Sequence, residues 1–150
     1  MHETSAESSK PPHPHGRVKQ LRLVVSVPEG EDFEAALAFY RDVLGMPQQE
    51  AYEGDDDARV VILGAGRATL ELSNAAQVRY IDRVEAEGQP SATLRVALEV
   101  TDAATSTDDA VEGGAELVAE PRQTPWRSVN SRLNGPAGLQ LTLFEELDSE

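Results

Sequence analysis

The stretch Leu94-Arg-Val-Ala-Leu-Glu-Val100 decides the fold, because it is the second copy of a pattern that occurs earlier in the chain. The first copy is Leu21-Arg-Leu-Val-Val-Ser-Val27, in which apolar residues also occupy every second position. Such alternation is typical of a β-strand with one buried face. Both copies open on Leu-Arg, so Arg22 and Arg95 are matching residues 73 positions apart. We therefore expect two related modules, each beginning with one of these strands.

The elements that follow each opening strand recur in one order: a helix, a strand and a hairpin. Gly45 and Gly114 end the two helices 69 positions apart, and Leu70 and Leu141 lie in the two last strands 71 positions apart. Two copies of strand–helix–strand–strand–strand predict an α+β fold of two tandem βαβββ modules, which share one structure. The predicted helices cover 32–44, 75–88 and 102–112; the later strands cover 46–52, 59–63, 67–73, 115–120, 126–133 and 139–144, with turns at 64–66 and 134–138.

The composition restricts the class of protein. The chain has 150 residues, a formal net charge of −14 and no cysteine. This length fits one domain, and the excess of negative charge disfavours binding to phosphate backbones and anionic membranes. The missing cysteines exclude disulfides and thiolate zinc sites, and no apolar run is long enough for a membrane span or a secretory signal. We therefore expect a cytoplasmic protein that binds neither nucleic acid nor membranes.

The histidines are confined to one end of the chain. His2, His13 and His15 all lie within residues 1–16, a segment rich in Ser and Pro that predicts a flexible tail. The remainder is expected to be one domain over 17–146, with a first module at 18–73, a connecting helix at 75–88 and a second module at 92–146. Chemistry in that domain has to use carboxylates, hydroxyls, amides, Arg, Lys and aromatic rings.

Three segments are distinctive beyond their periodicity: Ala38-Phe-Tyr-Arg-Asp-Val-Leu-Gly45, Ala68-Thr-Leu-Glu-Leu-Ser73 and Asn134-Gly-Pro-Ala-Gly-Leu-Gln-Leu-Thr-Leu-Phe144. They resemble the first-helix signature, the fourth strand and the closing hairpin of the vicinal oxygen chelate superfamily, the glyoxalase, bleomycin-resistance and extradiol-dioxygenase group. The resemblance covers residues 18–146. It implies a curved mixed sheet that encloses a cleft, and it implies a homodimer.

Metalloenzymes of that superfamily hold their ion with side chains from the first and last strands of each module. The resemblance places these four positions at Arg22, Glu71, Arg95 and Thr142, and only Glu71 is a residue that binds metals. A guanidinium group stays charged and has no acceptor, so it repels a cation. We therefore expect no metal ion and no cofactor.

Alternation also assigns the faces of the strands, because a slip of one residue would reverse every side chain. The helix-facing side is expected to carry Leu23, Val25, Val27, Leu94, Val96, Leu98, Val100, Leu70, Leu72, Leu141 and Leu143. The cleft side is expected to carry Arg22, Val24, Ser26, Arg95, Ala97, Glu99, Thr69, Glu71, Ser73, Gln140, Thr142 and Phe144.

Arg22, Glu71 and Arg95 admit two interpretations: they bind an anionic group of a ligand, or they form an internal ion network in place of the metal. Two guanidinium groups beside one carboxylate predict a surplus of positive charge that selects an anionic ligand. Glu71 is also a candidate general base, although the neighbouring arginines are expected to lower its pKa. Trp126 and Phe144 are candidates either for stacking on a ligand or for packing.

The preferred hypothesis is a metal-independent protein, similar to the bleomycin-resistance branch, that binds or sequesters a small anionic or polar molecule. Arg22, Arg95, Glu71, Thr142, Glu99, Gln140, Trp126 and Phe144 are the expected ligand-binding residues. A second hypothesis is an enzyme of the glyoxalase, lyase or dioxygenase kind, in which Glu71 is the base or binds a metal with help from Glu99 or Gln140. A third is a scaffold whose cleft is filled by its own Arg–Glu network.

Overall fold

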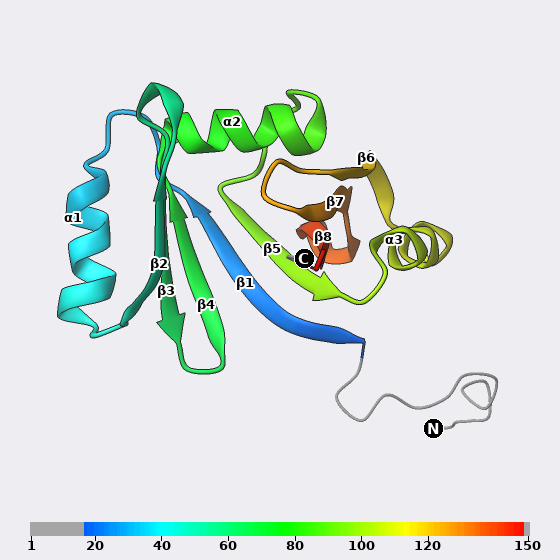
Figure 1. Cartoon of the computed structure of the whole chain (residues 1–150), viewed down its shortest axis with the longest axis horizontal. Coiled ribbons are helices and arrows are strands. Elements are labelled where there is room, and N and C mark those ends of the chain that lie inside the picture. The colour runs from blue at the N-terminus through cyan, green and yellow to red at the C-terminus, as the bar shows by residue number, and fades with distance from the viewer. Residues whose placement is uncertain (1–16, 149–150) are drawn as a thin grey trace.

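The computed structural model describes residues 17–148, and two βαβββ modules follow one another along them (Figure 1). The α+β class and the order of the elements are as the sequence predicts. The first module comprises β1 (Val18–Ser26), α1 (Phe33–Ala38), the π-helix η2 (Phe39–Val43), β2 (Gln48–Glu53), the 3-10 turn η3 (Asp55–Asp57), β3 (Arg59–Ala65) and β4 (Ala68–Ser73). After α2 (Ala75–Ala86), the second module comprises β5 (Leu94–Val100), α3 (Ala103–Glu112), β6 (Glu116–Gln123), β7 (Ser128–Asn134), η4 (Pro136–Gly138) and β8 (Gln140–Glu146).

The strands form one eight-stranded mixed sheet in the order β2-β3-β4-β1-β5-β8-β7-β6. Within each module the last strand runs parallel to the first, since β1 pairs with β4 and β5 pairs with β8. The two opening strands, β1 and β5, pair antiparallel at the centre and join the modules. The repeated stretches of the sequence therefore lie side by side, which brings Arg22 and Arg95 onto adjacent strands.

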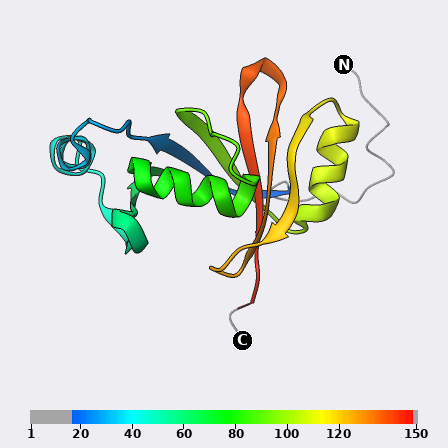
Figure 2. The same cartoon turned by 90° about the horizontal axis from the view of Figure 1, so that it is seen from above.

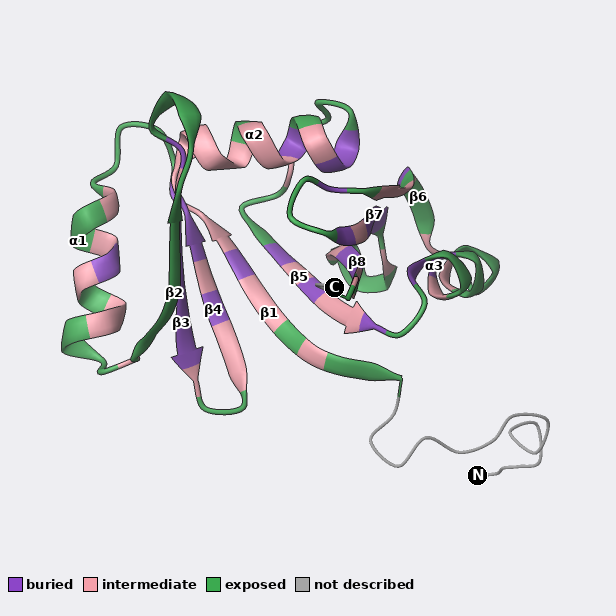
Figure 3. Ribbon diagram, viewed as in Figure 1, coloured by how far each residue is buried: buried purple, intermediate pink, exposed green. Residues whose placement is uncertain are grey.

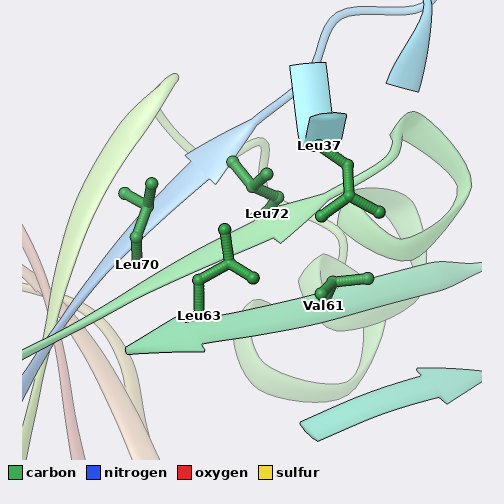
Figure 4. Close-up of a cluster of buried hydrophobic side chains, with 5 residues drawn as sticks. All are labelled: Leu37, Val61, Leu63, Leu70 and Leu72. Atoms are coloured by element: carbon green, nitrogen blue, oxygen red, sulfur yellow. The ribbon is translucent and has the colours of Figure 1, made fainter. Parts of the chain in front are cut away.

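Each module packs the predicted apolar side of its strands against its own helix. Figure 4 shows Leu37 of α1 directed toward four side chains of β3 and β4, and all five are buried (Val61, Leu63, Leu70 and Leu72 with Leu37). In the second module, Val100, Leu133 and Leu143 bury Ala103 of α3. Burying a leucine side chain contributes about 1.5–3 kcal/mol, so these clusters hold the two halves of the sheet in register. The predicted register is confirmed.

The other face of the central strands carries a smaller buried cluster of Val24, Ala97 and Phe144. Helix α2 crosses over this region between the modules (Figures 1 and 2), and it contacts β3 and β4 on one side and β6 and β7 on the other. Edge strand β2 is exposed along its whole length (Figure 3). The connecting helix therefore belongs to both modules, which the sequence did not indicate.

The first helix differs from its prediction over 32–44. Regular α-helix ends at Ala38, and the chain continues as a π-helix in which the amide of Leu44 donates to the carbonyl of Phe39, five residues earlier (3.0 Å). Apolar residues at helical spacing fit either helix, so periodicity could not detect the change. Gly45, at φ +78°, ends the helix as predicted.

Several predicted boundaries differ from the structure by one to three residues, and two of them have a clear local cause. The first hairpin turns at Gly66-Arg67 rather than at 64–66, because Ala65 still pairs with Ala68. Strand β7 begins at Ser128 rather than at 126, because Arg127 adopts a left-handed conformation at φ +65° in the preceding turn.

The predicted tail, residues 1–16, lies outside the described residues. Among residues 17–148, no helix combines the length and the apolar character that crossing a membrane requires.

Candidate functional site

A cleft of about 740 Å³ lies between the curved sheet, α2 and the β2–η3 segment. Its lining includes all four positions at which the resemblance implied metal ligands: Arg22, Glu71, Arg95 and Thr142. The strand register explains why they meet. Glu71 lies opposite Val24 on the neighbouring strand, Thr142 lies opposite Ala97, and Val24 itself lies opposite Arg95. The pairing of the modules therefore assembles the predicted cluster on one face of four central strands.

Arg22 lies on the first-module side of the cleft and keeps part of its guanidinium group in solvent. Its Nη2 donates to Glu146 Oε2 (3.3 Å), and its Nη1 is 4.0 Å from Glu71 Oε1. The guanidinium carbon lies 4.8 Å from the centroid of the Phe144 ring, within the range of a cation–π contact. Side-chain exposure is 22% for Arg22 and 16% for Glu71, so a ligand in the cleft can reach both groups.

Arg95 is deeper, with 7% of its surface exposed. Its Nη1 donates to Thr142 Oγ1 (2.7 Å) and is 3.7 Å from Glu85 Oε2, while Thr142 Oγ1 donates to the same Glu85 oxygen (2.5 Å). Its buried Nε donates to no acceptor among residues 17–148. A buried donor without a partner costs about 1–3 kcal/mol.

Glu85 of α2 is the functional residue that the sequence analysis missed. Its carboxylate accepts from Asn130 Nδ2 (2.8 Å), Arg132 Nε (3.0 Å) and Thr142, so it lies where donors from β7 and β8 converge. Arg132 is fully buried and also donates to Asp82 Oδ1 (2.8 Å), one helical turn before Glu85. The available signal was a helix with acidic residues at 82 and 85 beside a strand with polar residues at 128, 130 and 132. Neither pattern alone shows that the two elements meet.

The two cleft glutamates differ in pKa because their partners differ. For Glu71, burial outweighs the attraction of Arg95 and Arg22 and raises the pKa, and the charges of Glu85 and Glu50 add to this shift. The arginines lower the pKa of Glu71 as expected, but burial outweighs them, so the net shift is upward. For Glu85, burial also acts upward, but Arg95 and Arg132, with hydrogen bonds from Asn130 and Thr142, hold the pKa below its ordinary value. Glu85 is thus the permanent anion of the site, and Glu71 is the carboxylate that protonates more readily.

Trp126 and Phe144 line the cleft, as the ligand-binding hypothesis requires. Trp126 is 43% exposed and packs on Tyr80 of α2 with ring centroids 6.1 Å apart, whereas Phe144 is buried beneath Arg22. Glu99 and Gln140, two other expected ligand-binding residues, are not among the residues that line the cleft. Glu99 lies beyond the cleft at the end of β5 and accepts from Gln20 Nε2 (2.8 Å), and Gln140 at the start of β8 accepts from the amide of Ala92 (2.8 Å). Both lie on the predicted face, but the cleft is shorter than the strands.

The cleft has no surplus of positive charge. Glu85 supplies a second carboxylate beside Arg95, and the complete lining carries seven carboxylates against the three guanidinium groups of Arg22, Arg83 and Arg95. The prediction of a positive pocket is therefore wrong, because it counted only the residues of the sheet. The arginines remain the principal donors of the floor, while the excess of negative charge lies toward the mouth.

The residues present do not fit a metal ion. Arg22 and Arg95 offer no lone pair, and Thr142 Oγ1 is engaged between Arg95 and Glu85. Within residues 17–148, no three His, Cys, Asp or Glu side chains are grouped so that they could hold an ion. The Arg–Glu network lies in the floor and leaves the cleft open, so the scaffold hypothesis, which required side chains to fill the cleft, loses its premise.

A profile of the Glyoxalase/Bleomycin resistance protein/Dioxygenase superfamily matches residues 30–143, and the chain belongs to this superfamily. No curated protein matches the sequence significantly. The fold and the βαβββ pairing were the expectations that the resemblance carried, and both agree with this membership.

Several solved structures share the fold at low identity. A hypothetical protein from Bacillus halodurans C-125 has a TM-score of 0.63 at 15% identity, over 88% of this chain and 96% of its own. Methylmalonyl-CoA epimerase from Mycobacterium tuberculosis has a TM-score of 0.56 at 18% identity, over 88% and 89%. A 4-hydroxymandelate synthase mutant from Streptomyces coelicolor has a TM-score of 0.56 at 22% identity, over 88% of this chain and 39% of its own. These likenesses concern the fold.

Proposed function

We propose that this protein binds and sequesters a small molecule in its cleft without a metal ion, in the manner of the bleomycin-resistance branch of the superfamily. The observation that carries the proposal is the presence of Arg22 and Arg95 at two ligand positions of a cleft of about 740 Å³. An arginine at these positions cannot bind a cation, but it can donate hydrogen bonds to an acceptor group of a ligand.

The acceptor that fits is a carboxylate or another polar oxygen group. Arg22 lines the cleft with 22% of its side chain exposed, and Arg95 lines the same cleft. Hydrogen bonds from charged donors contribute about 1.5–3 kcal/mol each, enough to orient a ligand of modest size. Trp126, which lines the same cleft and is 43% exposed, offers a stacking surface for the apolar part of that ligand.

Calorimetric titration with benzoate, phenylacetate and N-acetylphenylalanine, each beside its neutral amide, tests the proposal. At least one carboxylate is expected to bind saturably, and Arg95→Met is expected to weaken it about tenfold or more. Arg22→Met, at the more exposed arginine, is the second variant if Arg95→Met does not fold. Arg79→Met is the control, because Arg79 pairs with Glu29 on the surface and does not line the cleft. Failure of every carboxylate to bind, or an unchanged affinity in both cleft variants, contradicts the proposal.

Metal independence has its own test. Binding of the same carboxylate is expected to be unchanged after exhaustive dialysis of tag-free protein against EDTA. Elemental analysis of that protein is expected to find less than a stoichiometric amount of Zn, Ni, Fe or Mn. Binding that disappears on dialysis and returns with one of these ions would contradict the proposal and favour the enzyme hypothesis.

The raised pKa of Glu71 favours a second candidate, an enzyme in which this residue transfers protons. Its carboxyl is partly exposed in the cleft beside Arg22, which could stabilise a developing oxyanion. Exchange of deuterium into phenylpyruvate and into a phenylacetyl thioester, next to the carbonyl, is the measurement. Exchange above the solvent rate that Glu71→Gln abolishes and Arg79→Met preserves supports an enzyme. Exchange at the solvent rate rejects proton abstraction by Glu71.

The expected homodimer stays a prediction, and analytical ultracentrifugation of the full chain tests it.

A further inference from the structure

The mouth of the cleft carries a charge opposite to that of its arginine floor. Glu50 and Glu53 of β2 and Asp55 and Asp56 of η3 line the cleft on one side, and we call these four residues the acidic rim. All four are exposed. Within residues 17–148, the side chains of Glu53, Asp55 and Asp56 form neither an ion pair nor a hydrogen bond, so their negative charge is available to a ligand.

The acidic rim is fixed to the structure that carries the rest of the cleft. Asp56 and Asp57 adopt left-handed conformations at φ +58° and +67°, which few residues other than Gly, Asn and Asp accept. Asn74, which caps α2, donates to the carbonyl of Asp57 (2.7 Å) and accepts from the amides of Arg59 (3.0 Å) and Gln77 (2.9 Å). The rim therefore holds its position relative to α2, the helix that also carries Glu85.

Arg95 lines the same cleft as the acidic rim, so the cleft holds a buried cation as well as exposed carboxylates. The Arg95 side chain is more than nine-tenths buried and leaves Nε without a partner among the described residues. A simple anion that approaches the arginines enters a cleft that these carboxylates also line, and charges act over about 8 Å at physiological salt, so the acidic rim repels it. An acceptor group that is joined to a cation avoids this repulsion.

We propose that the ligand of this cleft is dipolar: an anionic or polar acceptor group binds Arg95 and Arg22, and an amine or guanidine group binds the acidic rim. This inference rests on the proposed function and adds the second charge of the ligand. The exposed faces of Trp126 and Tyr52, which line the cleft between floor and mouth, suit an apolar or planar middle section.

Three peptide probes separate the two ends of the ligand. Lys-Gly-Phe carries both charges, its C-terminal amide lacks the carboxylate, and N-acetyl-norleucyl-Gly-Phe lacks the cations. The wild-type chain is expected to bind Lys-Gly-Phe about tenfold more tightly than the norleucyl peptide. The triple variant Glu53→Gln, Asp55→Asn and Asp56→Asn is expected to bring that ratio to about one, because the preference for the cationic peptide comes from the negative charge of the rim. If this variant does not fold, Glu53→Gln alone is expected to reduce the ratio.

A matched control variant removes the same number of negative charges as the rim variant, but at positions outside the cleft. Glu31→Gln, Glu112→Gln and Glu120→Gln replace three exposed glutamates that do not line it, and this variant is expected to keep the tenfold ratio. Equal affinity of the wild type for the two carboxylate peptides, or a ratio that survives in the rim variant, overturns the dipolar ligand.

The proposed function fails separately: it fails if Arg95→Met binds both carboxylate peptides as the wild type does. If neither peptide binds while one of the simple carboxylates does, the dipolar ligand fails and the proposed function stands.

Discussion

Glu85 carries a negative charge into the interior, and Asn130, Arg132 and Thr142 hold it there. A buried ion pair contributes little net stability, because desolvation offsets most of the Coulomb attraction. Removing one partner is different, since the other charge is then buried alone. The network around Glu85 therefore fixes how α2 docks on the second module more than it stabilises the whole chain.

The substitution Arg132→Met tests the role of the network around Glu85, because it removes the network's fully buried guanidinium group. The substitution leaves the carboxylates of Asp82 and Glu85 without their main donor, so we expect a loss of about 3–5 kcal/mol in the free energy of unfolding. Urea denaturation followed by circular dichroism measures it. Arg122→Met, which breaks the exposed pair with Glu87, is expected to cost less than about 1 kcal/mol. Equal losses in the two variants would contradict the structural role of Arg132.

Glu71 gives a prediction about pH. Its pKa is raised above 4.5 in the folded chain, mainly by burial, so the folded state binds this proton more tightly than the unfolded state does. Stability from this group is therefore complete below about pH 4.5 and is lost as the pH rises through the folded pKa. Glu71→Gln keeps the neutral form at every pH. The stability of Glu71→Gln relative to the wild type is expected to increase as the pH rises from about 4.5 through the folded pKa of Glu71, and then to level off.

Denaturation curves at several pH values measure this difference. Glu31→Gln removes an equal charge from the exposed surface and is expected to show no such rise. A Glu71→Gln difference that stays constant between pH 4 and pH 8 would show that burial does not control this carboxyl.

At the scale of elements, helix α2 has three structural roles around the cleft. Asn74 caps it and holds the acidic rim, Glu85 anchors its last turn in the second module, and Tyr80 packs on Trp126 across the cleft. The sequence indicates that this helix is a linker, because it lies between the two repeats and has no counterpart in either. Its contacts with both modules make it a wall of the site (Figure 1).

Asn74→Ala is expected to destabilise the chain by about 1–2 kcal/mol, the upper part of the range for the loss of a helix cap. The value is high because the substitution removes the bonds to Arg59 and Asp57 together with the cap on Gln77. Asp32→Ala, where the side chain accepts only from Ala35, is the matched comparison and is expected to cost less. A larger loss for Asp32→Ala would contradict the role of Asn74 as a clamp.

The whole molecule is expected to unfold as one unit, because β1 and β5 join the modules at the centre of a single sheet. Leu72→Ala tests this from the first module: the side chain is fully buried, so its removal is expected to cost about 2–5 kcal/mol. Trp126, the single tryptophan, reports from the second module. We expect the variant to lower the midpoint of its fluorescence transition as much as that of the circular dichroism transition. A fluorescence midpoint that does not move would show that the modules unfold independently.

The sequence by itself determined the two modules and the faces of their strands. These follow from local patterns, since a period of two assigns a face and a repeat of about seventy residues assigns matching positions. The segments 38–45, 68–73 and 134–144 carried the resemblance to the family, and that resemblance implied that Arg22, Glu71, Arg95 and Thr142 lie around one cleft.

Only the tertiary structure decided the charge of the cleft. Glu85, Asn130 and Arg132 meet because α2 packs over β6 and β7, and the acidic rim shares a cleft with Arg95 because β2 and η3 line the same hollow. Electrostatic interaction depends on distance in space and on burial, neither of which is a property of sequence spacing. That is why the residue types at the metal positions could be read in advance, whereas the balance of charge around them could not.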